Sequence, residues 1–181
     1  RFPARSVSQS YHGQGRFRML TVNASHVAIR AKRMSPETLI HTLRGYRDTY
    51  GRRTGSSQGK LVPFNLVPGI EIASRRLKAG GFLDEAVELG LNLHELLNEK
   101  PGPVFLEATA SPQRGPTQRT QSVLQFTDLG MIWKRHSGGI EVFVFSHHSG
   151  KPVSGAEVSV MDDDNQLLQK TRCDRQGIAR I

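Results

Sequence analysis

The chain of 181 residues is 36% hydrophobic and 23% charged, a composition typical of a protein with a substantial apolar core. Its apolar stretches all fall short of the roughly 18 residues that a membrane-spanning helix needs. A single cysteine, Cys173, excludes an internal disulfide and a cysteine-rich metal cluster. The length allows one or two domains, so the pattern of elements must decide between them.

The net charge of +9 arises in the first third of the chain. Residues 1–60 carry 12 Lys and Arg against 2 Asp and Glu, whereas residues 61–120 carry 6 against 7 and residues 121–181 carry 7 against 7. Clustered cations are typical of surfaces that bind nucleic acid. Arg16 and Arg18, and likewise Arg30 and Lys32, alternate with apolar residues, as on the solvent side of a strand. We therefore favour a solvated surface whose charge is balanced by neighbouring parts of a larger protein.

The first 60 residues predict two strands and a short helix. Residues 1–15 lack periodicity and read as a linker, and strands follow at 17–22 and 27–33. Ser35 supplies a helix-capping hydroxyl, followed by Pro and Glu in the first turn, so a helix is expected to about Leu43. The glycine-rich residues 46–60 predict a long exposed loop.

The middle of the chain predicts further strands, interrupted by one or two helical turns before a Pro-Gly-Pro break. A polar hairpin loop or interdomain junction is then expected, followed by a strand that passes between domains. These elements are, in order, strands at 61–67 and 69–74, an extended segment at 86–91, helical turns at 93–98, a strand at 104–110, the loop at 114–121 and the connecting strand at 122–134.

Residues 126–181 show the clearest pattern, a β-meander of short strands separated by turn residues. Apolar and polar residues alternate within the strands, and the turns carry Ser-Gly, Pro, Asp-Asn and Asp-Arg-Gln-Gly sequences. A strand about every eight to twelve residues is the spacing of a β-sandwich. The expected strands are 141–146, 156–161, 166–172 and 178–181, with the last closing a hairpin with the one before it.

The sequence TDLGMIWKR at 127–135, followed by a strand and then by SGKPVSGAEVSVMDDDNQLLQKTRCDRQGIARI, resembles a macroglobulin-like domain of the bacterial alpha-2-macroglobulins. These are large cell-envelope proteins that trap proteases. The later part alone also resembles carboxypeptidase regulatory-like and transthyretin-like sandwiches, so the TDLG start makes the match specific. Transthyretin-like or Ig-like modules of a cell-surface adhesin therefore remain the alternative.

The resemblance implies a mainly β fold of two consecutive macroglobulin-like (fibronectin III-like) sandwiches. The first would span residues 1–120 and contain one or two short helices, and the second would span residues 121–181. Such domains usually continue with further strands, and the chain opens at Arg1 rather than Met, so we expect a fragment whose second sandwich is incomplete. The open edge near Ile181 should mediate any self-association, through residues 140–181.

The resemblance also implies a function. We expect non-catalytic scaffold domains, not an enzyme, of a protease-trapping inhibitor that serves bacterial defence. The resemblance implies that the parent protein lies in the periplasm or cell envelope, often anchored through a lipidated N-terminus. The expected partners are neighbouring domains of the parent protein and the proteases that the whole protein engages. We expect no nucleic-acid binding and no direct membrane insertion by this fragment; a nucleic-acid-binding domain that uses the basic residues 1–60 is the less favoured alternative.

Cys173 and Gln176 have the separation of the Cys and Gln that form the family's thioester. That thioester uses Cys-x-Glu-Gln on a loop of a helical domain, whereas here Asp174 and Arg175 intervene and the segment predicts a β-hairpin. We therefore reject a thioester at this position. Trp133, the single tryptophan, lies in a predicted strand, where core or interdomain packing is the expected role.

The other candidates for chemistry have simpler explanations. His147 and His148 are adjacent, so on a strand they would point to opposite faces and could not easily share a metal ion. Asp162–Asn165 lacks the alternation and central glycine of a calcium loop and predicts a capped turn. The glycines of 13–15 and 80–81 do not lead from a strand into a capped helix, as a phosphate loop would. We therefore assign no catalytic, cofactor-binding or metal-binding residue and no cofactor.

Overall fold

The computed structural model describes residues 2, 6–35, 61–80, 83–98, 100–112, 115–162, 164 and 166–181, with the side chains of 6–10 excepted. The chain is mainly β, as expected from the sequence, and forms two compact units, Arg1–Thr127 and Asp128–Ile181. The helix expected at 35–43 and the loop expected at 46–60 fall almost wholly outside the described residues.

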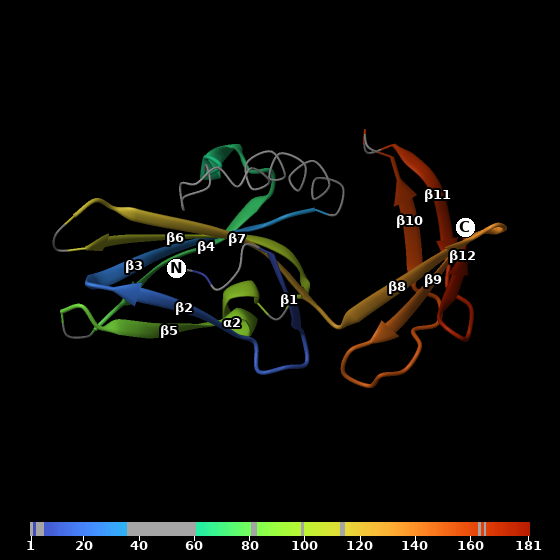
Figure 1. Cartoon of the computed structure of the whole chain (residues 1–181), viewed down its shortest axis with the longest axis horizontal. Helices are drawn as coiled ribbons and strands as arrows, with labels where there is room; N and C mark the ends of the chain where they lie inside the picture. The colour runs from blue at the N-terminus through green and yellow to red at the C-terminus, as the bar shows by residue number, and fades with distance from the viewer. Residues whose placement is uncertain are drawn as a thin grey trace. The chain divides into compact units, whose positions relative to one another are not determined.

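A five-stranded sheet forms the centre of unit 1, with strand order β1-β7-β6-β3-β4 (Figure 1). β1 pairs in parallel with β7, and the other neighbours are antiparallel. The prediction of a linker over residues 1–15 was therefore wrong for 6–10, because these residues pair with 123–127. The strands are β1 (Ser6–Ser10), β3 (Ala24–Arg33), β4 (Ile70–Lys78), β6 (Gly102–Pro112) and β7 (Gln118–Thr127).

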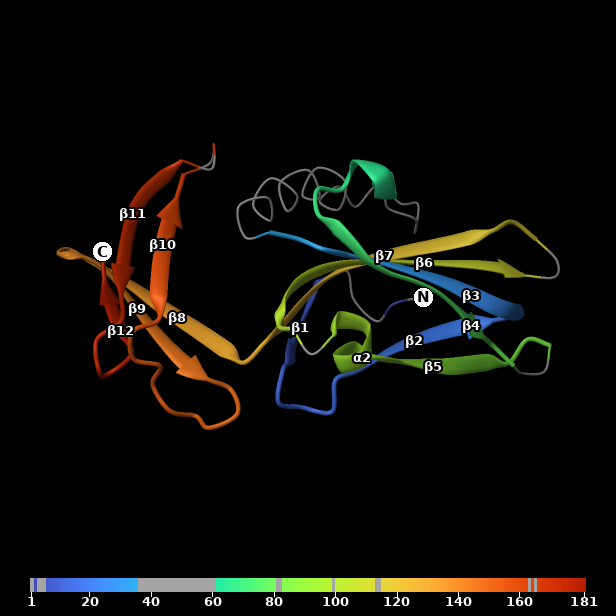
Figure 2. The ribbon, with the colours of Figure 1, turned by 180° about the vertical axis from the view of Figure 1, so that it is seen from behind.

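The inner face of this sheet is covered by the antiparallel pair β2 (Arg16–Val22) and β5 (Ala86–Asn92) and by helix α2 (Leu93–Leu97), as Figures 1 and 2 show. The Asn92 side chain accepts hydrogen bonds from the backbone N–H groups of His94 and Glu95 and so caps α2. These elements confirm the strands and helical turn expected from the sequence.

Apolar side chains from both layers meet in the main core of unit 1. In β2 the residues alternate strictly between exposed and buried, because one face of the strand lies on the core. Phe17 and Met19 are almost completely buried, and Phe2 packs on Phe17 with ring centroids 5.2 Å apart. The other buried members are Val27, Ile29, Ala31, Ala79, Leu91, Leu93, Leu96, Leu97, Val104, Leu106, Ala108, Leu124 and Phe126.

The outer face of the sheet is partly covered by residues 61–67. A strand was predicted there, but the segment contains the 3-10 helix η1 (Phe64–Leu66), which begins after Pro63. Pro63 lacks a backbone N–H for strand pairing, which is the physical reason for this difference. Phe64 and Val67 pack against a second, smaller apolar cluster on the sheet.

Residues 118–134 do not form one continuous strand. β7 runs the length of the sheet beside β6 and ends at Thr127, and β8 (Leu129–His136) begins after a bend at Asp128. The prediction of a polar loop was wrong for 118–121, because these residues pair with 107–110 of β6. The division between the units accordingly falls after Thr127, later than the boundary expected after residue 120.

Unit 2 contains two small sheets rather than a meander. Its final strand pairs with β9 and not with β11, so the expected closing hairpin was wrong. At the crossover Gly177 has φ of +73° and its carbonyl accepts a hydrogen bond from the N–H of Val144, and a Cβ there would collide with the Val144 carbonyl. The sheets are β12-β9-β8, formed by Ile178–Arg180, Gly139–Ser146 and β8, and β10-β11, formed by Glu157–Met161 and Leu167–Arg172.

The core of unit 2 lies between these sheets and is small. Val142 and Val144 of β9 meet Val158, Cys173 and Ala179 there. The core does not extend under β8, where Trp133 is 61% exposed. The expectation of core packing for Trp133 was therefore wrong within this unit, because the β10-β11 sheet does not cover that edge strand.

Candidate functional site

Charged and polar side chains gather on the outer face of the unit 1 sheet, beneath residues 61–67. Strand register places Arg30 opposite Glu107, and Glu107 opposite Gln121, so the three side chains share one face. Lys32 and Glu71 are opposite one another two residues further along. We call these five residues the outer-face cluster. Lys32, Glu107 and Gln121 are all buried.

Gln121 joins the sheet to the covering segment. Its side-chain oxygen accepts a hydrogen bond from the Val62 N–H at 3.0 Å, and its amide nitrogen donates to the Val62 carbonyl at 2.7 Å. The same nitrogen donates to Glu107 Oε2 at 2.7 Å. The side-chain amide thus pairs with Val62 as a strand backbone would, and neutral hydrogen bonds of this kind each contribute about 1 kcal/mol net.

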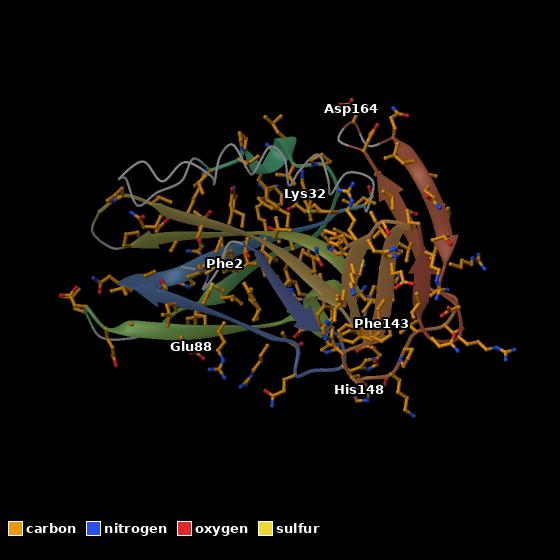
Figure 3. The ribbon with its side chains drawn as sticks, turned by 45° about the vertical axis from the view of Figure 1, so that its right-hand side comes forward. Phe2, Lys32, Glu88, Phe143, His148 and Asp164 are labelled. Carbon is orange, nitrogen blue, oxygen red and sulfur yellow. The ribbon has the colours of Figure 1, made fainter. Side chains whose placement is uncertain are left out.

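Lys32, which Figure 3 labels, holds the other end of the covering segment. Its ammonium donates to the Val67 carbonyl at 2.8 Å and lies 4.9 Å from the centre of the Phe64 ring. Arg30 stacks on the same ring at 3.9 Å and binds Glu71 through two hydrogen bonds, of 2.8 and 3.1 Å. The hydrogen bond from Arg30 is the main cause that lowers the pKa of Glu71.

The outer-face cluster is balanced, with two cations, two carboxylates and an amide. Its described contacts fix residues 61–67 to the sheet, and this is a structural role. The sequence signal for the cluster was a charged or amide residue at alternate positions of a strand, with apolar residues between them. Arg30 and Lys32 show this pattern most clearly. The alternation predicts that both cations face solvent, and for Lys32 this prediction was wrong because segment 61–67 covers it.

A cleft between β4 and α2 is also lined by charged residues. Arg33 reaches across it and donates to the carbonyl of Leu97, the last residue of α2, at 2.9 Å, and to that of Pro101 in the following loop at 3.0 Å. Arg75 pairs with Glu95 of α2. The charges of this cleft therefore hold α2 in place.

The TDLG motif has a structural explanation in unit 2. Asp128 accepts a hydrogen bond from the N–H of His147 on its backbone carbonyl and one from the N–H of His148 on its carboxylate. Figure 3 labels His148, which lies in the turn after β9. The two histidines thus lie in a turn rather than on a strand.

Gly130 completes the motif. It lies opposite Phe145 in the β8–β9 pair, and a Cβ at this position would overlap the Phe145 ring. Only glycine leaves room for the ring to lie flat across β8. Asp128 and Gly130 therefore have structural roles that account for two of the four residues of the TDLG motif.

Cys173 and Gln176 do not meet. Cys173 is buried in the unit 2 core, where desolvation, with a smaller contribution from Asp174, raises the pKa of its thiol. Gln176 is exposed in the following turn. The Asp174 carboxylate accepts from the N–H groups of Gln176 and Ile178, each at 2.9 Å, so the segment is a capped turn.

The remaining candidates take structural roles where they are described. Asp162 caps its turn by accepting from the N–H groups of Asp164 at 2.9 Å and Gln166 at 2.8 Å. Gly15, with φ of +59°, lies against the His94 ring, and Gly81 is outside the described residues. Within the described ranges no three His, Cys, Asp or Glu side chains are grouped closely enough to hold a metal ion. The helices of these ranges are also too short or too polar to cross a membrane.

Residues 126–181 match the family model described as the bacterial alpha-2-macroglobulin MG3 domain. No curated protein sequence matches the chain. The chain aligns over 99% of its length with native alpha-2-macroglobulin from Escherichia coli spanning domains NIE-MG1, with a TM-score of 0.71, 18% identity and 84% of that chain covered.

Two longer structures show the same fold. Trypsin-activated alpha-2-macroglobulin from Escherichia coli aligns over 99% of this chain with a TM-score of 0.74 and 16% identity. Salmonella alpha-2-macroglobulin reacted with methylamine gives a TM-score of 0.60 and 18% identity, again over 99% of this chain. The chain spans 12% and 10% of these two structures, respectively. The MG3 match over the second unit, with a fold shared along almost the whole chain, confirms the resemblance to the bacterial alpha-2-macroglobulin family.

Proposed function

We propose that the two units are consecutive scaffold domains of a bacterial alpha-2-macroglobulin-like inhibitor that traps proteases. The match of residues 126–181 to the MG3 domain carries this proposal. The chain is similar to about a tenth of two longer alpha-2-macroglobulins, one of them activated by trypsin, so protease engagement is assigned to the parent protein and not to these domains alone.

A non-catalytic role is consistent with how the polar residues are used. The outer-face cluster holds segment 61–67, the cleft charges hold α2, and Cys173 lies in a core away from Gln176. These contacts keep packed sheets rigid, and rigidity is what a domain needs if it is to move as a body when the parent rearranges. Neighbouring domains of the parent are the proposed partners, and the periplasm or cell envelope is the proposed location.

Four of the five cations that the structure describes in residues 1–60 give the nucleic-acid alternative little support. Arg18 Nε lies 3.4 Å from Glu88 Oε1, and Arg30 binds Glu71. Lys32 is buried, and Arg33 donates hydrogen bonds to backbone carbonyls. Side chains held in this way are not available as a counterion-releasing patch.

The test compares the isolated chain with its full-length parent. Trypsin is incubated with each, and its activity is measured on a small chromogenic substrate and on a large protein substrate. A trap lets the small substrate in and excludes the large one, so the parent should protect the large substrate selectively. The isolated chain should protect neither and hydrolyse neither.

A parent that is simply digested, with no selective protection, would overturn the protease-trap proposal. Hydrolysis by the isolated chain would overturn the scaffold role. Fractionation of cells that express the parent tests the location, and recovery of the parent in the cytosol with a cytosolic marker would contradict it.

A further inference from the structure

The outer face of the unit 1 sheet has a second half that segment 61–67 does not cover. Strand register places Arg76 of β4 opposite Ala28 of β3, Ala28 opposite Thr109 of β6, and Thr109 opposite Arg119 of β7. Directly opposed residues lie on the same face, so these four form one row across the sheet. Lys78 lies two residues beyond Arg76 on the same face of β4.

The row is strongly cationic. Arg76, Lys78 and Arg119 are exposed, and within the described ranges none of them forms an ion pair with a carboxylate. The carboxylates on this face are already engaged, Glu71 by Arg30 and Glu107 by Gln121. The open half of the face therefore carries three positive charges that its own sheet does not offset.

The shape of the row also suits a partner. Ala28 and Thr109 have short side chains, so the floor between the two arginines is low and flat. Neighbouring strands are about 4.8 Å apart, which separates the arginine Cα atoms by about 14 Å across three strand spacings. An extended polypeptide covers that distance with about four residues, so carboxylates along one short segment can reach both guanidinium groups.

We propose that this row, Arg76–Ala28–Thr109–Arg119 with Lys78, docks an acidic polypeptide segment. Arginine is suited to this partner because its planar fork binds a carboxylate through two parallel hydrogen bonds. A single-stranded nucleic acid would also be attracted by the charge, but it gains much of its affinity from stacking on aromatic rings. Within the described residues the row contains no Phe, Tyr or Trp, and Phe64 and Phe105 of the same face are buried.

The proposal is tested with the whole chain and a fluorescent peptide of about ten glutamate residues, long enough to span the row more than twice. Binding is followed by fluorescence anisotropy from low salt to about 0.15 M, where exposed charges are screened over roughly 8 Å. We expect binding at low salt that weakens as salt increases. The double variant Arg76→Gln/Arg119→Gln should bind about tenfold more weakly.

The matched control is Arg135→Gln/Arg175→Gln, which removes two exposed arginines of unit 2 and changes the net charge equally. The control should bind the peptide as the unaltered chain does, and all three proteins should melt at the same temperature. Equal weakening by both double variants, or no binding by the unaltered chain, would overturn the proposal. Tighter binding of polyuridylate than of the peptide, lost in the Arg76/Arg119 variant, would overturn the assignment of a polypeptide partner.

Discussion

The carboxylate of Asp128 accepts a hydrogen bond from the backbone N–H of His148 at 2.9 Å. The backbone carbonyl of Asp128 also accepts from the N–H of His147 at 2.7 Å. One residue before β8 thereby holds the turn that follows β9, two segments that are about 20 residues apart in the chain. These two hydrogen bonds close one end of the β8–β9 pair.

Replacing Asp128 with Ala should lower the free energy of unfolding of unit 2 by about 1 to 2 kcal/mol, because a charged acceptor is lost. Asp128→Asn keeps an oxygen acceptor and should lose less. Urea unfolding of the whole chain, followed by circular dichroism and by the fluorescence of Trp133, the single tryptophan, measures both. Equal losses in the two variants would contradict the role of the hydrogen bond.

Gly130→Ala should destabilise unit 2 by about 1 to 3 kcal/mol, because its Cβ would overlap the Phe145 ring. Gly90→Ala is the matched control, since a Cβ at Gly90 meets nothing within 4 Å, and it should change stability by no more than about 0.5 kcal/mol. Adding Phe145→Leu to Gly130→Ala removes the obstacle. A double variant whose loss equals the sum of the two single losses would show that the ring is not the cause.

Gln121→Leu should cost about 2 to 4 kcal/mol, because three hydrogen bonds that join β7 to Val62 and Glu107 disappear. The exposed Gln125 lies on the same strand, and Gln125→Leu should have almost no effect. Thermal unfolding of the whole chain compares the two. Similar melting temperatures for both variants would mean that segment 61–67 contributes little to the stability of unit 1.

The stability of unit 2 should depend on pH through Asp174. Hydrogen bonds from the N–H groups of Ile178 and Gln176 and the charge of Arg180 lower the pKa of Asp174 below its ordinary 3.8. Because the folded-state pKa is depressed, the ionised carboxylate stabilises unit 2 above pH 3.8, and this is lost as pH falls through the lower folded-state value. The stability difference between the unaltered chain and Asp174→Asn should therefore shrink on acidification in this window, and a constant difference would contradict the assignment.

Cys173 should react slowly in the folded chain. Burial raises the pKa of its thiol, so little reactive thiolate is present and access is restricted. Alkylation by iodoacetamide at pH 8 should be at least about tenfold slower in buffer than in urea. The mass of the intact chain should show no loss of ammonia, and such a loss would instead establish a thioester with Gln176.

The alternation of apolar residues in β2, β3 and β9 was sufficient to predict these strands, because alternate residues of each face a core. Residues 6–10 and the segment around Pro63 were predicted wrongly from their local sequence. A polar pentapeptide becomes a strand only because β7 offers a free edge beside it, and an apolar segment with a central proline becomes a 3-10 turn.

The candidate site shows the same limit. The Asp-Arg-Gln-Gly sequence of 174–177 was enough to indicate a turn, since an aspartate at the start of such a turn caps the backbone N–H groups that follow. The outer-face cluster was not predicted, because Arg30, Lys32, Glu71, Glu107 and Gln121 are scattered over 92 positions and meet only through the register of four strands.

By itself, the sequence determined the β character of the chain, the turns of residues 126–181 and the resemblance carried by Asp128 and Gly130, because these depend on local alternation and backbone conformation. Only the tertiary structure decided that β12 joins β9, that Lys32 is buried while Trp133 is exposed, and that Arg76 and Arg119 share a row. Such pairings depend on which strands become neighbours, and that is set by burial of the two cores and not by any one segment.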